Sequence, residues 1–367
     1  MKRIICTVTN DLNFDQRMIR ICCSLAGAGY EVLLVGRRLP HSSRLAKRPY
    51  KQKRFNLFFK KGKLFYVEYN IRLFAFLLFA KYDVVCSVDL DTLLPGFIIS
   101  KIKRKKCVYD AHEYFTEVPE LVERPIIKGI WEVIARWVVP RVKYACTVGE
   151  CLANELEKKY GISFCVIRNV PLKKNFFIKK IKNNNPFILI YQGVLNEGRG
   201  LEEVIAAMNQ LDGVELWLVG EGDLSGKLRQ LAAKQNTKNK IVFHGYVLPE
   251  NLHALTMRAH LGLNILKNKG LNYYYSLANK TFDYMQAGIP SVCMNFPEYK
   301  NIQKKYGAIV LVKDSTPSAI AHTVDYLKTN IRAYNQLCTE SKRAAQQLIW
   351  EKEEKKLIAF YRNLIAD

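Results

Sequence analysis

The stretch FILIYQGVLNEGRGLEEVIAAMNQL, residues 187–211, predicts a strand, a glycine-rich loop and a helix in succession. The apolar run that opens it is typical of a strand buried on both faces, as in a parallel sheet covered by helices. In the loop, Gly193, Gly198 and Gly200 surround Arg199. In a doubly wound α/β sheet such a loop lies at the carboxyl end of a strand, where ligands bind.

The same alternation of strands and helices runs through the chain twice. In the first half the predicted strands are 3–9, 31–36, 64–69, 83–88, 106–110, 144–149 and 163–169. In the second half they are 187–193, 214–222, 240–247, 260–266 and 291–295. We therefore expect an α/β protein with two Rossmann-like, doubly wound domains that face each other across a cleft.

The length of 367 residues also favours two domains over a single core. The lysine- and asparagine-rich stretch 171–186 interrupts the alternation and is the predicted linker. It separates an N-terminal domain, 1–170, from a C-terminal domain, 187–349. The segment 350–367 has the pattern of an amphipathic helix.

Composition predicts a cytoplasmic protein. No signal peptide is visible, and the longest apolar stretch, 73–80, is too short to span a membrane. The ten cysteines include no CxxC pair, which suits buried thiols in a reducing compartment better than disulfides or zinc ligands.

The chain is strongly basic, with a formal net charge of +24. Residues 1–106 hold 22 Lys/Arg and 7 Asp/Glu. Such a field attracts nucleic acid or an anionic membrane, but no RNA-binding signature or zinc-finger spacing accompanies it, so no nucleic-acid partner is expected. In 51–63, apolar Phe55, Leu57, Phe58 and Phe59 lie among basic residues, which predicts shallow insertion into an anionic interface. The alternative is a basic loop that only aids solubility.

Two segments of the second half have the residue types of a nucleoside diphosphate site. The 193–200 loop offers glycines that let the backbone approach a phosphate and Arg199, which can bind two oxygens. In NKTFD, Asn279 and Lys280 begin a helix, with Lys280 suited to a phosphate and Asp283 to a ribose diol. The alternatives are an ordinary turn with a solvent-exposed arginine and a surface Lys–Asp pair.

Two weaker signals accompany them. Gly220 lies in the Gly-x-Gly turn of VGEGD (219–223), a pattern that is common in purely structural turns. Tyr246 lies in HGYV (244–247), where backbone groups can contact the edge of a base.

The order and spacing of these motifs resemble glycosyltransferase family 4, and the resemblance covers nearly the whole chain. ANKTFDYM is similar to the PNKLFEYM of one branch. The resemblance implies a GT-B arrangement, a nucleoside-diphosphate sugar as donor and retention of anomeric configuration. It gives Arg199 the role of diphosphate ligand and Asp283 that of ribose ligand. It also implies that the closing helix, which begins at Trp350, packs on the first domain.

The chain departs from the family pattern at three positions. Asp283 replaces the usual glutamate, Tyr275 replaces the first glutamate of the E-x7-E pattern, and Val194 replaces a basic residue that often follows the first glycine of the loop. These departures indicate a divergent branch, and they leave the donor sugar undefined.

The first half is expected to hold the acceptor. In TNDLNFDQR (9–17), Asn10, Asp11 and Arg17 follow a strand and are assigned to the acceptor side, while Asp15 can cap the next helix. In VYDAHEYF (108–115) the strand ends in Asp110. The resemblance places His112 near the transferred sugar, with Glu113 on the acceptor side.

The Asp-x-Asp of SVDLDT (87–92) matches the metal-binding signature of a different glycosyltransferase fold. Because it lies far from the phosphate loops in sequence, Asp89 and Asp91 are interpreted as helix-capping or acceptor-side residues. Neither a metal nor another cofactor is expected, since Arg199, Lys280 and a helix N-terminus provide the positive charge.

The predicted function is transfer of a sugar from a nucleoside-diphosphate sugar to a hydroxyl of a glycan or glycolipid, in cell-surface polysaccharide or lipopolysaccharide assembly. His112, Arg199 and Lys280 are the predicted catalytic residues. A peripheral position on the cytoplasmic face of a membrane is also expected. The alternatives are a sugar-nucleotide epimerase or hydrolase on the same scaffold and a non-catalytic basic binding protein.

Overall fold

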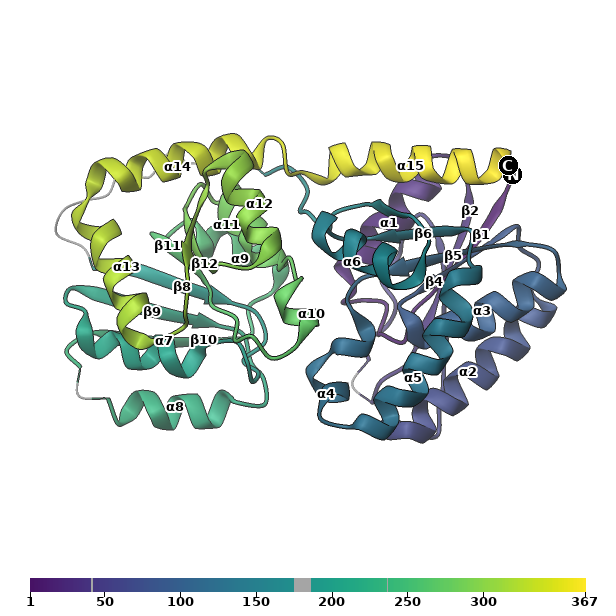
Figure 1. Cartoon of the computed structure of the whole chain (residues 1–367), viewed down its shortest axis with the longest axis horizontal. Helices are drawn as coiled ribbons and strands as arrows, with labels where there is room; N and C mark the ends of the chain where they lie inside the picture. The colour runs from purple at the N-terminus through teal and green to yellow at the C-terminus, as the bar shows by residue number, and fades with distance from the viewer. Residues whose placement is uncertain (41, 175–185, 236) are drawn as a thin grey trace. The chain divides into compact units, whose positions relative to one another are not determined.

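The computed structural model describes residues 1–40, 42–174, 186–235 and 237–367. The chain forms two compact units (Figure 1). Unit 1 comprises Met1–Asn169 and Lys352–Asp367, and unit 2 comprises Val170–Glu351. Most of the predicted linker 171–186 lies outside the described residues. Both units are α/β with a parallel sheet, so the prediction of two Rossmann-like domains is confirmed.

The sheet of unit 1 has seven parallel strands in the order β3-β2-β1-β4-β5-β6-β7. The strands are β1 (Arg3–Thr7), β2 (Glu31–Arg37), β3 (Lys51–Phe55), β4 (Val84–Val88), β5 (Lys106–Ala111), β6 (Tyr144–Thr147) and β7 (Phe164–Val166). The chain runs outward from β1 on one side and outward from β4 on the other. The switch point of this doubly wound sheet therefore lies between β1 and β4.

The helices of unit 1 cover both faces of this sheet. They are α1 (Gln16–Gly27), α2 (Gly62–Phe79), α3 (Leu90–Ile102), α4 (Pro119–Val122), α5 (Pro125–Val138), α6 (Glu150–Tyr160) and α15 (Trp350–Ala366), with 3-10 turns at Phe115–Glu117 and Val139–Arg141.

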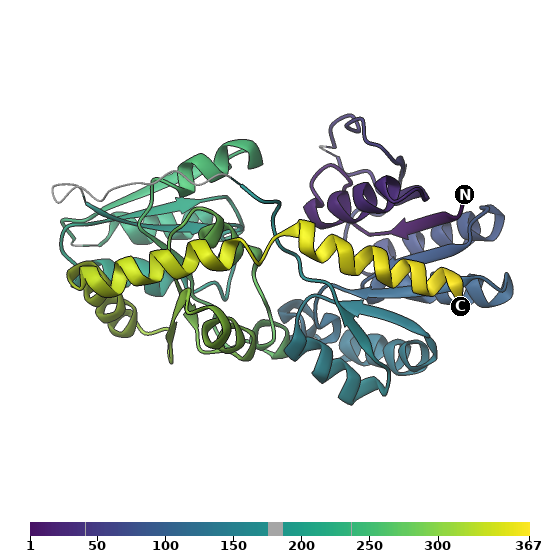
Figure 2. The same ribbon diagram turned by 90° about the horizontal axis from the view of Figure 1, so that it is seen from above.

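Two of these helices show which face is covered by which part of the chain. Successive residues of a strand face opposite sides of its sheet. On β4, Cys86 interacts with the buried Tyr361 of α15. The next residue, Ser87, faces α3, where a Cβ on Gly96 would lie 2.2 Å from its Oγ. Helix α15 thus covers one face of the sheet (Figures 1 and 2), and α3 covers the other.

In unit 1, one predicted strand was wrong and one strand was not predicted. The expected strand 64–69 is the start of α2, whose inner face is formed at helical spacing by Phe65, Tyr69, Leu73 and Leu77. The aromatic residues at its start favour a strand locally, but the apolar pattern continues for 18 residues. The edge strand β3 was not predicted, because its sequence KQKRF is polar apart from the buried Phe55 and so lacks the apolar run expected of a strand.

Unit 2 has six parallel strands in the order β10-β9-β8-β11-β12-β13. They are β8 (Phe187–Gln192), β9 (Val214–Val219), β10 (Lys240–Gly245), β11 (Leu261–Asn264), β12 (Ser291–Met294) and β13 (Ile309–Val312). The helices are α7 (Leu201–Ala207), α8 (Ser225–Ala233), α9 (Pro249–Thr256), α10 (Leu271–Tyr274), α11 (Asn279–Gln286), α12 (Pro297–Tyr306), α13 (Pro317–Thr329) and α14 (Ile331–Ala345), with a 3-10 turn at Met208–Gln210. The switch point lies between β8 and β11.

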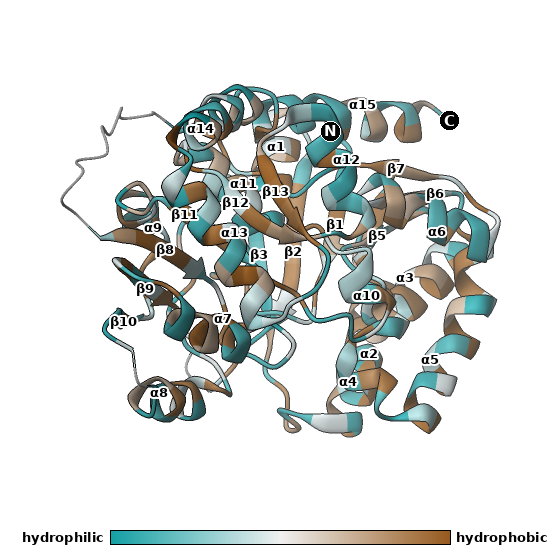
Figure 3. Ribbon diagram, turned by 60° about the vertical axis from the view of Figure 1, so that its left-hand side comes forward, coloured by the Kyte–Doolittle hydropathy of each residue, from teal (hydrophilic) through white to brown (hydrophobic). Residues whose placement is uncertain are grey.

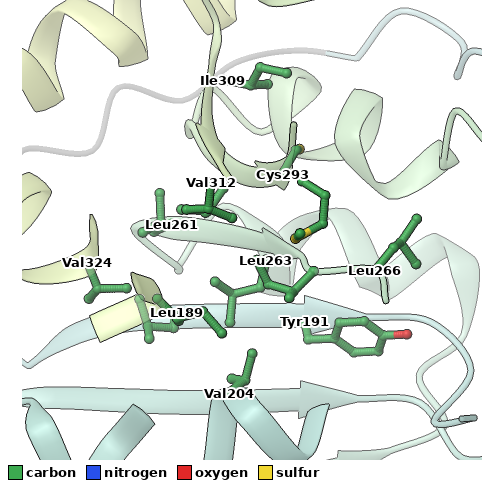
Figure 4. Close-up of a cluster of buried hydrophobic side chains, with 14 of the residues drawn as sticks. Leu189, Tyr191, Val204, Leu261, Leu263, Leu266, Cys293, Ile309, Val312 and Val324 are labelled. Carbon is green, nitrogen blue, oxygen red and sulfur yellow. The ribbon is translucent and has the colours of Figure 1, made fainter. Parts of the chain in front are cut away.

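The core of unit 2 lies between its sheet and the helices that cover it. Apolar side chains of neighbouring strands, such as Leu189 and Leu263, meet residues of the helices, such as Val204 and Val324 (Figure 4). The strands are coloured hydrophobic along much of their length, as expected for a parallel sheet buried on both faces (Figure 3). Tyr191 lies at the carboxyl end of β8, and its hydroxyl points away from the cluster (Figure 4). This strand end is where the candidate site is built.

Candidate functional site

Three loops pack closely at the carboxyl ends of β8, β9 and β10. The Gly193 N–H donates to the Val219 carbonyl at 2.9 Å, and the Gly220 N–H donates to the Gly245 carbonyl at 2.8 Å. Gly220 has φ +132°, and a Cβ on it would lie 2.0 Å from the Gly193 carbonyl oxygen. Only glycine fits at this position. Gly220, which was predicted as a donor-site residue, therefore lets the loop after β9 pack directly against the 193–200 loop.

Lys280, in the first turn of α11, extends to the start of this loop. Its Nζ lies 3.5 Å from the centroid of the Tyr191 ring. A Cβ on Gly193 would lie 3.3 Å from the same Nζ. The ammonium group is therefore held between an aromatic ring and the loop backbone, and its stem is half-buried.

Arg199 has a similar support on the other side of the loop. Its guanidinium carbon lies 5.0 Å from the centroid of the Tyr273 ring, which follows β11. Gly198, with φ +78°, lets this ring pack against the loop, since a Cβ there would lie 2.7 Å from a ring carbon. The Tyr273 hydroxyl donates to the Glu197 carbonyl at 3.3 Å, and the Tyr191 hydroxyl donates to the Val194 carbonyl at 2.8 Å.

Neither cation has a carboxylate partner among the residues that the structure describes. The Nε of Arg199 is buried and has no hydrogen-bond partner in that part of the chain. Burial, followed by the nearby Arg199 guanidinium, holds the pKa of Lys280 well below its ordinary value. Two cations that repel each other and form no ion pair among the described residues provide a site for an anion.

Asp283 is held by a relay of uncharged side chains. The Gln192 side-chain amide donates to the Asp283 carboxylate at 3.2 Å, and the Thr256 hydroxyl donates to the Gln192 side-chain carbonyl at 2.7 Å. The Gln192 backbone N–H donates to the Tyr284 hydroxyl at 3.2 Å. Asp283 remains partly exposed and can accept further hydrogen bonds from a diol.

The other predicted donor-site residues lie around this centre. Gly200 has φ +65°, and a Cβ there would lie 2.6 Å from the Ile265 carbonyl oxygen, so it joins the loops after β8 and β11 at the switch point. Asn279 is exposed at the first position of α11. Tyr246 is exposed beyond β10. Val194, where the family often has a basic residue, is also exposed.

Sequence reasoning missed Tyr191, Gln192 and Tyr273, the side chains that hold the charged groups. Tyr191 and Gln192 directly precede the first glycine of the loop, so their position at the strand end was the available signal. Tyr273 carried no signal of its own, because its role depends on the packing of α10 beside the loop.

In unit 1, Arg17 and Asp110 form a buried ion pair of 3.0 Å beside His112. Arg17 Nε donates to His112 Nε2 at 2.8 Å, and Arg17 Nη1 donates to the Ile167 carbonyl at 2.9 Å. Burial by itself would raise the pKa of Asp110, but Arg17 and His112 hold it below its ordinary value. Arg17 was assigned to the acceptor side from sequence. In the structure its guanidinium is buried and forms its contacts with Asp110, His112 and the Ile167 carbonyl within unit 1. His112 Nε2 also lies 3.0 Å from Asp110 Oδ2, so Arg17 and Asp110 both contact the same ring nitrogen.

Asp89 and Asp91 lie at the start of α3, beside the switch point. Asp89 occupies the N-cap position but does not cap with its side chain, so this part of the helix-capping interpretation was wrong. Its Oδ1 instead accepts from the His112 backbone N–H at 2.8 Å, and its φ is +55°. Asp91 accepts from the Thr9 hydroxyl at 2.6 Å. Burial raises the pKa of Asp91 to about 7, and burial together with Glu113 raises that of Asp89.

The remaining residues assigned to the acceptor side hold the loop after β1. Asn10 donates to Asp15 at 3.1 Å, and Asp15 accepts from the Met18 backbone N–H at 3.0 Å, which caps α1 as predicted. Asp11 accepts from the Ser42 hydroxyl and from Arg54. Glu113 is half-buried next to Asp89 and Asp91.

Over the described ranges, no group of three or more His, Cys, Asp or Glu has an arrangement suited to a metal ion. Within the same ranges, no helix combines the length and the apolar character that a membrane span needs.

Comparisons with known proteins identify the fold and the family. The model of Glycosyltransferase Family 4 matches residues 16–171, and that of Glycosyl transferases group 1 matches residues 186–330. No curated protein matches the sequence. The solved structures that are similar in fold over nearly their full length include three at low identity.

Anabaena Alr3699/HepE in complex with UDP is 13% identical, with a TM-score of 0.75 over 99% of this chain and 100% of that one. Sucrose-phosphate synthase from Thermosynechococcus elongatus is 16% identical, with a TM-score of 0.80 over 100% of each chain. WaaG, a glycosyltransferase involved in lipopolysaccharide biosynthesis, is 13% identical, with a TM-score of 0.72 over 97% of this chain and 98% of that one. The two matched family models and the two doubly wound units show that this chain belongs to the GT-B glycosyltransferases.

Proposed function

We propose that the protein is a retaining, metal-independent glycosyltransferase that transfers a hexose from a nucleoside-diphosphate sugar to a hydroxyl of a glycan or glycolipid. The observation that carries the proposal is the pair of cations, Arg199 and Lys280. Arg199 lies over the ring of Tyr273 and Lys280 over that of Tyr191, both beside the 193–200 loop. Neither forms an ion pair with a carboxylate in the described structure. The negative charge of a diphosphate would pair with both cations.

The chemistry follows from the position of these charges. When the bond between the sugar and the β-phosphate breaks, negative charge builds on the leaving diphosphate. Arg199 and Lys280 are already in place to stabilise it, and preorganised charge of this kind is a large part of catalysis in many enzymes. Asp283, held by Gln192, accepts hydrogen bonds from the ribose hydroxyls.

No side chain is assigned as a nucleophile. In the proposed mechanism the acceptor hydroxyl attacks the same face of the sugar that the diphosphate leaves, and the phosphate takes its proton. His112 is proposed, on the family resemblance, to contact the transferred sugar. Arg17 and Asp110 both contact its Nε2 and so hold the ring in place.

The neighbours in fold support the substrate classes. Structures of HepE contain UDP, UDP with glucose, or UDP-glucose, which favours a nucleotide sugar as donor. WaaB is described as a lipopolysaccharide outer core galactosyltransferase, and WaaG as involved in lipopolysaccharide biosynthesis. We extend this to the proposal that the acceptor belongs to cell-surface polysaccharide or lipopolysaccharide and is reached at the cytoplasmic face of a membrane.

The test is binding followed by product analysis. Calorimetric titration with UDP, GDP, ADP and CDP should show tight binding of one of them, and Arg199→Ala should weaken it strongly. Lys234→Ala, which removes an exposed cation from unit 2 away from this loop, is the matched control. With the matching sugar nucleotide and a glycan acceptor, NMR of the product should show the anomeric configuration of the donor. Failure to bind any nucleoside diphosphate would overturn the proposal.

A further inference from the structure

Helix α2 has an apolar stripe whose side chains stay exposed in the described structure. Its inner face is buried against unit 1, yet the opposite face is also apolar. Five exposed side chains follow one another at spacings of three and four residues along the whole helix: Leu64, Val67, Ile71, Phe74 and Leu78. Ile71, in the middle, is 64% exposed. We call this row the α2 stripe. An exposed contiguous apolar surface marks a site for a protein or a membrane.

Helix α5 has a second row of this kind. Ile126, Ile130, Val133 and Trp137 are exposed at helical spacing, and Val133 is 70% exposed. We call this row the α5 stripe. Gly129 and Arg136, close to this row, are exposed as well, so the row forms the outermost part of the helix.

The two helices are neighbours on one face of the sheet. Both contact α3, which is buried along most of its length. The ring of Tyr66 on α2 meets that of Trp131 on α5 with centroids 5.6 Å apart. Trp137 of the α5 stripe packs its ring on Phe97 of α3 at 5.9 Å. The stripes therefore belong to one layer of unit 1, and we call them together the apolar layer.

A loop adds two aromatic rings beside α2. Phe58 and Phe59 are exposed, Phe58 to 84%, whereas Leu57 and Phe55 of the same segment are buried. The predicted four-residue insertion cluster is thus reduced to two. The Glu68 carboxylate of α2 accepts from the backbone N–H groups of both, at 2.9 Å to 3.0 Å. The loop is therefore fixed to the helix by the single acidic residue between Phe58 and Lys81.

The excess positive charge of the apolar layer lies beside α2. From Phe58 to Lys81 the chain has five Lys/Arg and one Asp/Glu, whereas from Glu117 to Arg141, around α5, it has four of each. The single acidic residue of the α2 segment, Glu68, pairs with Arg72, and two cations of α5 are also paired, Lys128 with Glu117 and Arg136 with Glu132. The excess charge beside α2 is positive, and its complement is an anionic surface.

This sign decides between the two occupants that suit such a layer. A second copy of the chain would bring two basic rims together, and like charges opposed at an interface cost several kcal/mol. An anionic bilayer accepts the apolar side chains into its interface and attracts the lysines and arginines around them. We propose that the apolar layer of α2 and α5, with Phe58 and Phe59, docks unit 1 on an anionic lipid bilayer.

The proposal deepens the proposed lipid-linked acceptor, but its test needs no substrate. The full chain is sedimented with vesicles of phosphatidylcholine, with or without phosphatidylglycerol. Binding should require the anionic lipid and fall as salt is raised. Val67→Ser combined with Ile71→Ser should weaken binding about tenfold or more, because two apolar side chains no longer enter the interface. Leu248→Ser with Ile331→Ser, two exposed apolar residues of unit 2, is the matched control.

The contribution of charge is tested in the same way. Lys61→Glu with Lys63→Glu should abolish the preference for anionic lipid, whereas Lys304→Glu with Lys305→Glu, on α12 of unit 2, should leave it intact. All these side chains are exposed, so the variants should fold and bind nucleoside diphosphate as the wild type does. That second measurement separates failure of this proposal from failure of the proposed function.

Three outcomes would overturn the proposal. One is equal recovery with neutral and anionic vesicles, and another is an equal loss of binding in the control variants. The third concerns sedimentation velocity without vesicles: a wild-type dimer that the Val67 and Ile71 replacements convert to a monomer would identify the apolar layer as a contact between copies.

Discussion

Replacing Lys280 by methionine should make the unliganded protein more stable and abolish its response to nucleotide. Three contributions decide the sign. The ammonium loses a cation–π contact with Tyr191, worth about 0.5–2 kcal/mol at its 3.5 Å separation. A methionine sulfur near the same ring returns about 0.3–1.5 kcal/mol. Removing a poorly hydrated charge without a partner gains about 1–3 kcal/mol.

The last contribution exceeds the difference between the first two, so a net gain of about 1–2 kcal/mol is expected. For a unit of this size that raises the midpoint of thermal unfolding by about 2–8 °C. The gain should shrink as pH rises. Below the lowered pKa of Lys280 the charged form destabilises the fold, and above it the native lysine is neutral while the unfolded one still holds its proton.

The assay is thermal unfolding with and without the nucleoside diphosphate that binds. At a ligand concentration about a hundred times its dissociation constant, binding stabilises the wild type by about 2.7 kcal/mol. The Lys280→Met protein should lose this shift. Lys234→Met, at an exposed position, should change neither midpoint. A lower midpoint for Lys280→Met without ligand would show that the charge stabilises the fold, and the anion-site argument would fail.

Four further outcomes are expected. Arg199→Ala should reduce kcat about a hundredfold while leaving the unfolding midpoint nearly unchanged, since it removes charge stabilisation of the leaving diphosphate; wild-type turnover would contradict its role. Asp283→Asn should weaken nucleoside diphosphate binding about tenfold, and Asp283→Glu should be tolerated; calorimetry with the free diphosphate separates the two. Activity should survive EDTA, and a complete loss that Mn²⁺ restores would instead indicate a metal held by Asp89 and Asp91. Above the pKa of unliganded Lys280, diphosphate binding should take up a proton, seen as a binding enthalpy that depends on the ionisation enthalpy of the buffer, and Lys280→Met should remove this uptake.

The alternation of apolar strands with helices was enough to predict all strands of unit 1 except β3, all strands of unit 2 except β13, and the helix at 279–286, because each of these segments has the period of the structure it adopts. The spacing of apolar residues did not predict the structure of two segments, in which buried and exposed positions do not differ in polarity. Helix α2 is apolar on both faces, so its first residues resemble a strand, and β3 is an edge strand with charged side chains. Neither could be assigned from polarity alone.

The candidate site was predicted in part. Arg199, Lys280 and Asp283 are charged residues in loops or helix starts, where sequence patterns are informative. Their supports, Tyr191 and Tyr273, are uncharged and become significant only through contacts that the fold creates. The partner of Arg17 was likewise not predictable, because the buried ion pair of its guanidinium with Asp110 joins residues 93 positions apart in the chain.

Because helix α15 belongs to unit 1, the two units can complete their folds at different stages of synthesis. Unit 2 is continuous in sequence, from Val170 to Glu351, so all its residues have been synthesised before the last segment of unit 1 is made. Unit 1 lacks one layer until α15 is made, since Leu357, Tyr361 and Leu364 are buried there and Lys106 donates to the Leu364 carbonyl at 2.5 Å. The first 169 residues must therefore wait, with an apolar sheet face open, while the second half of the chain is translated. The half that begins synthesis first is therefore the last to complete its fold.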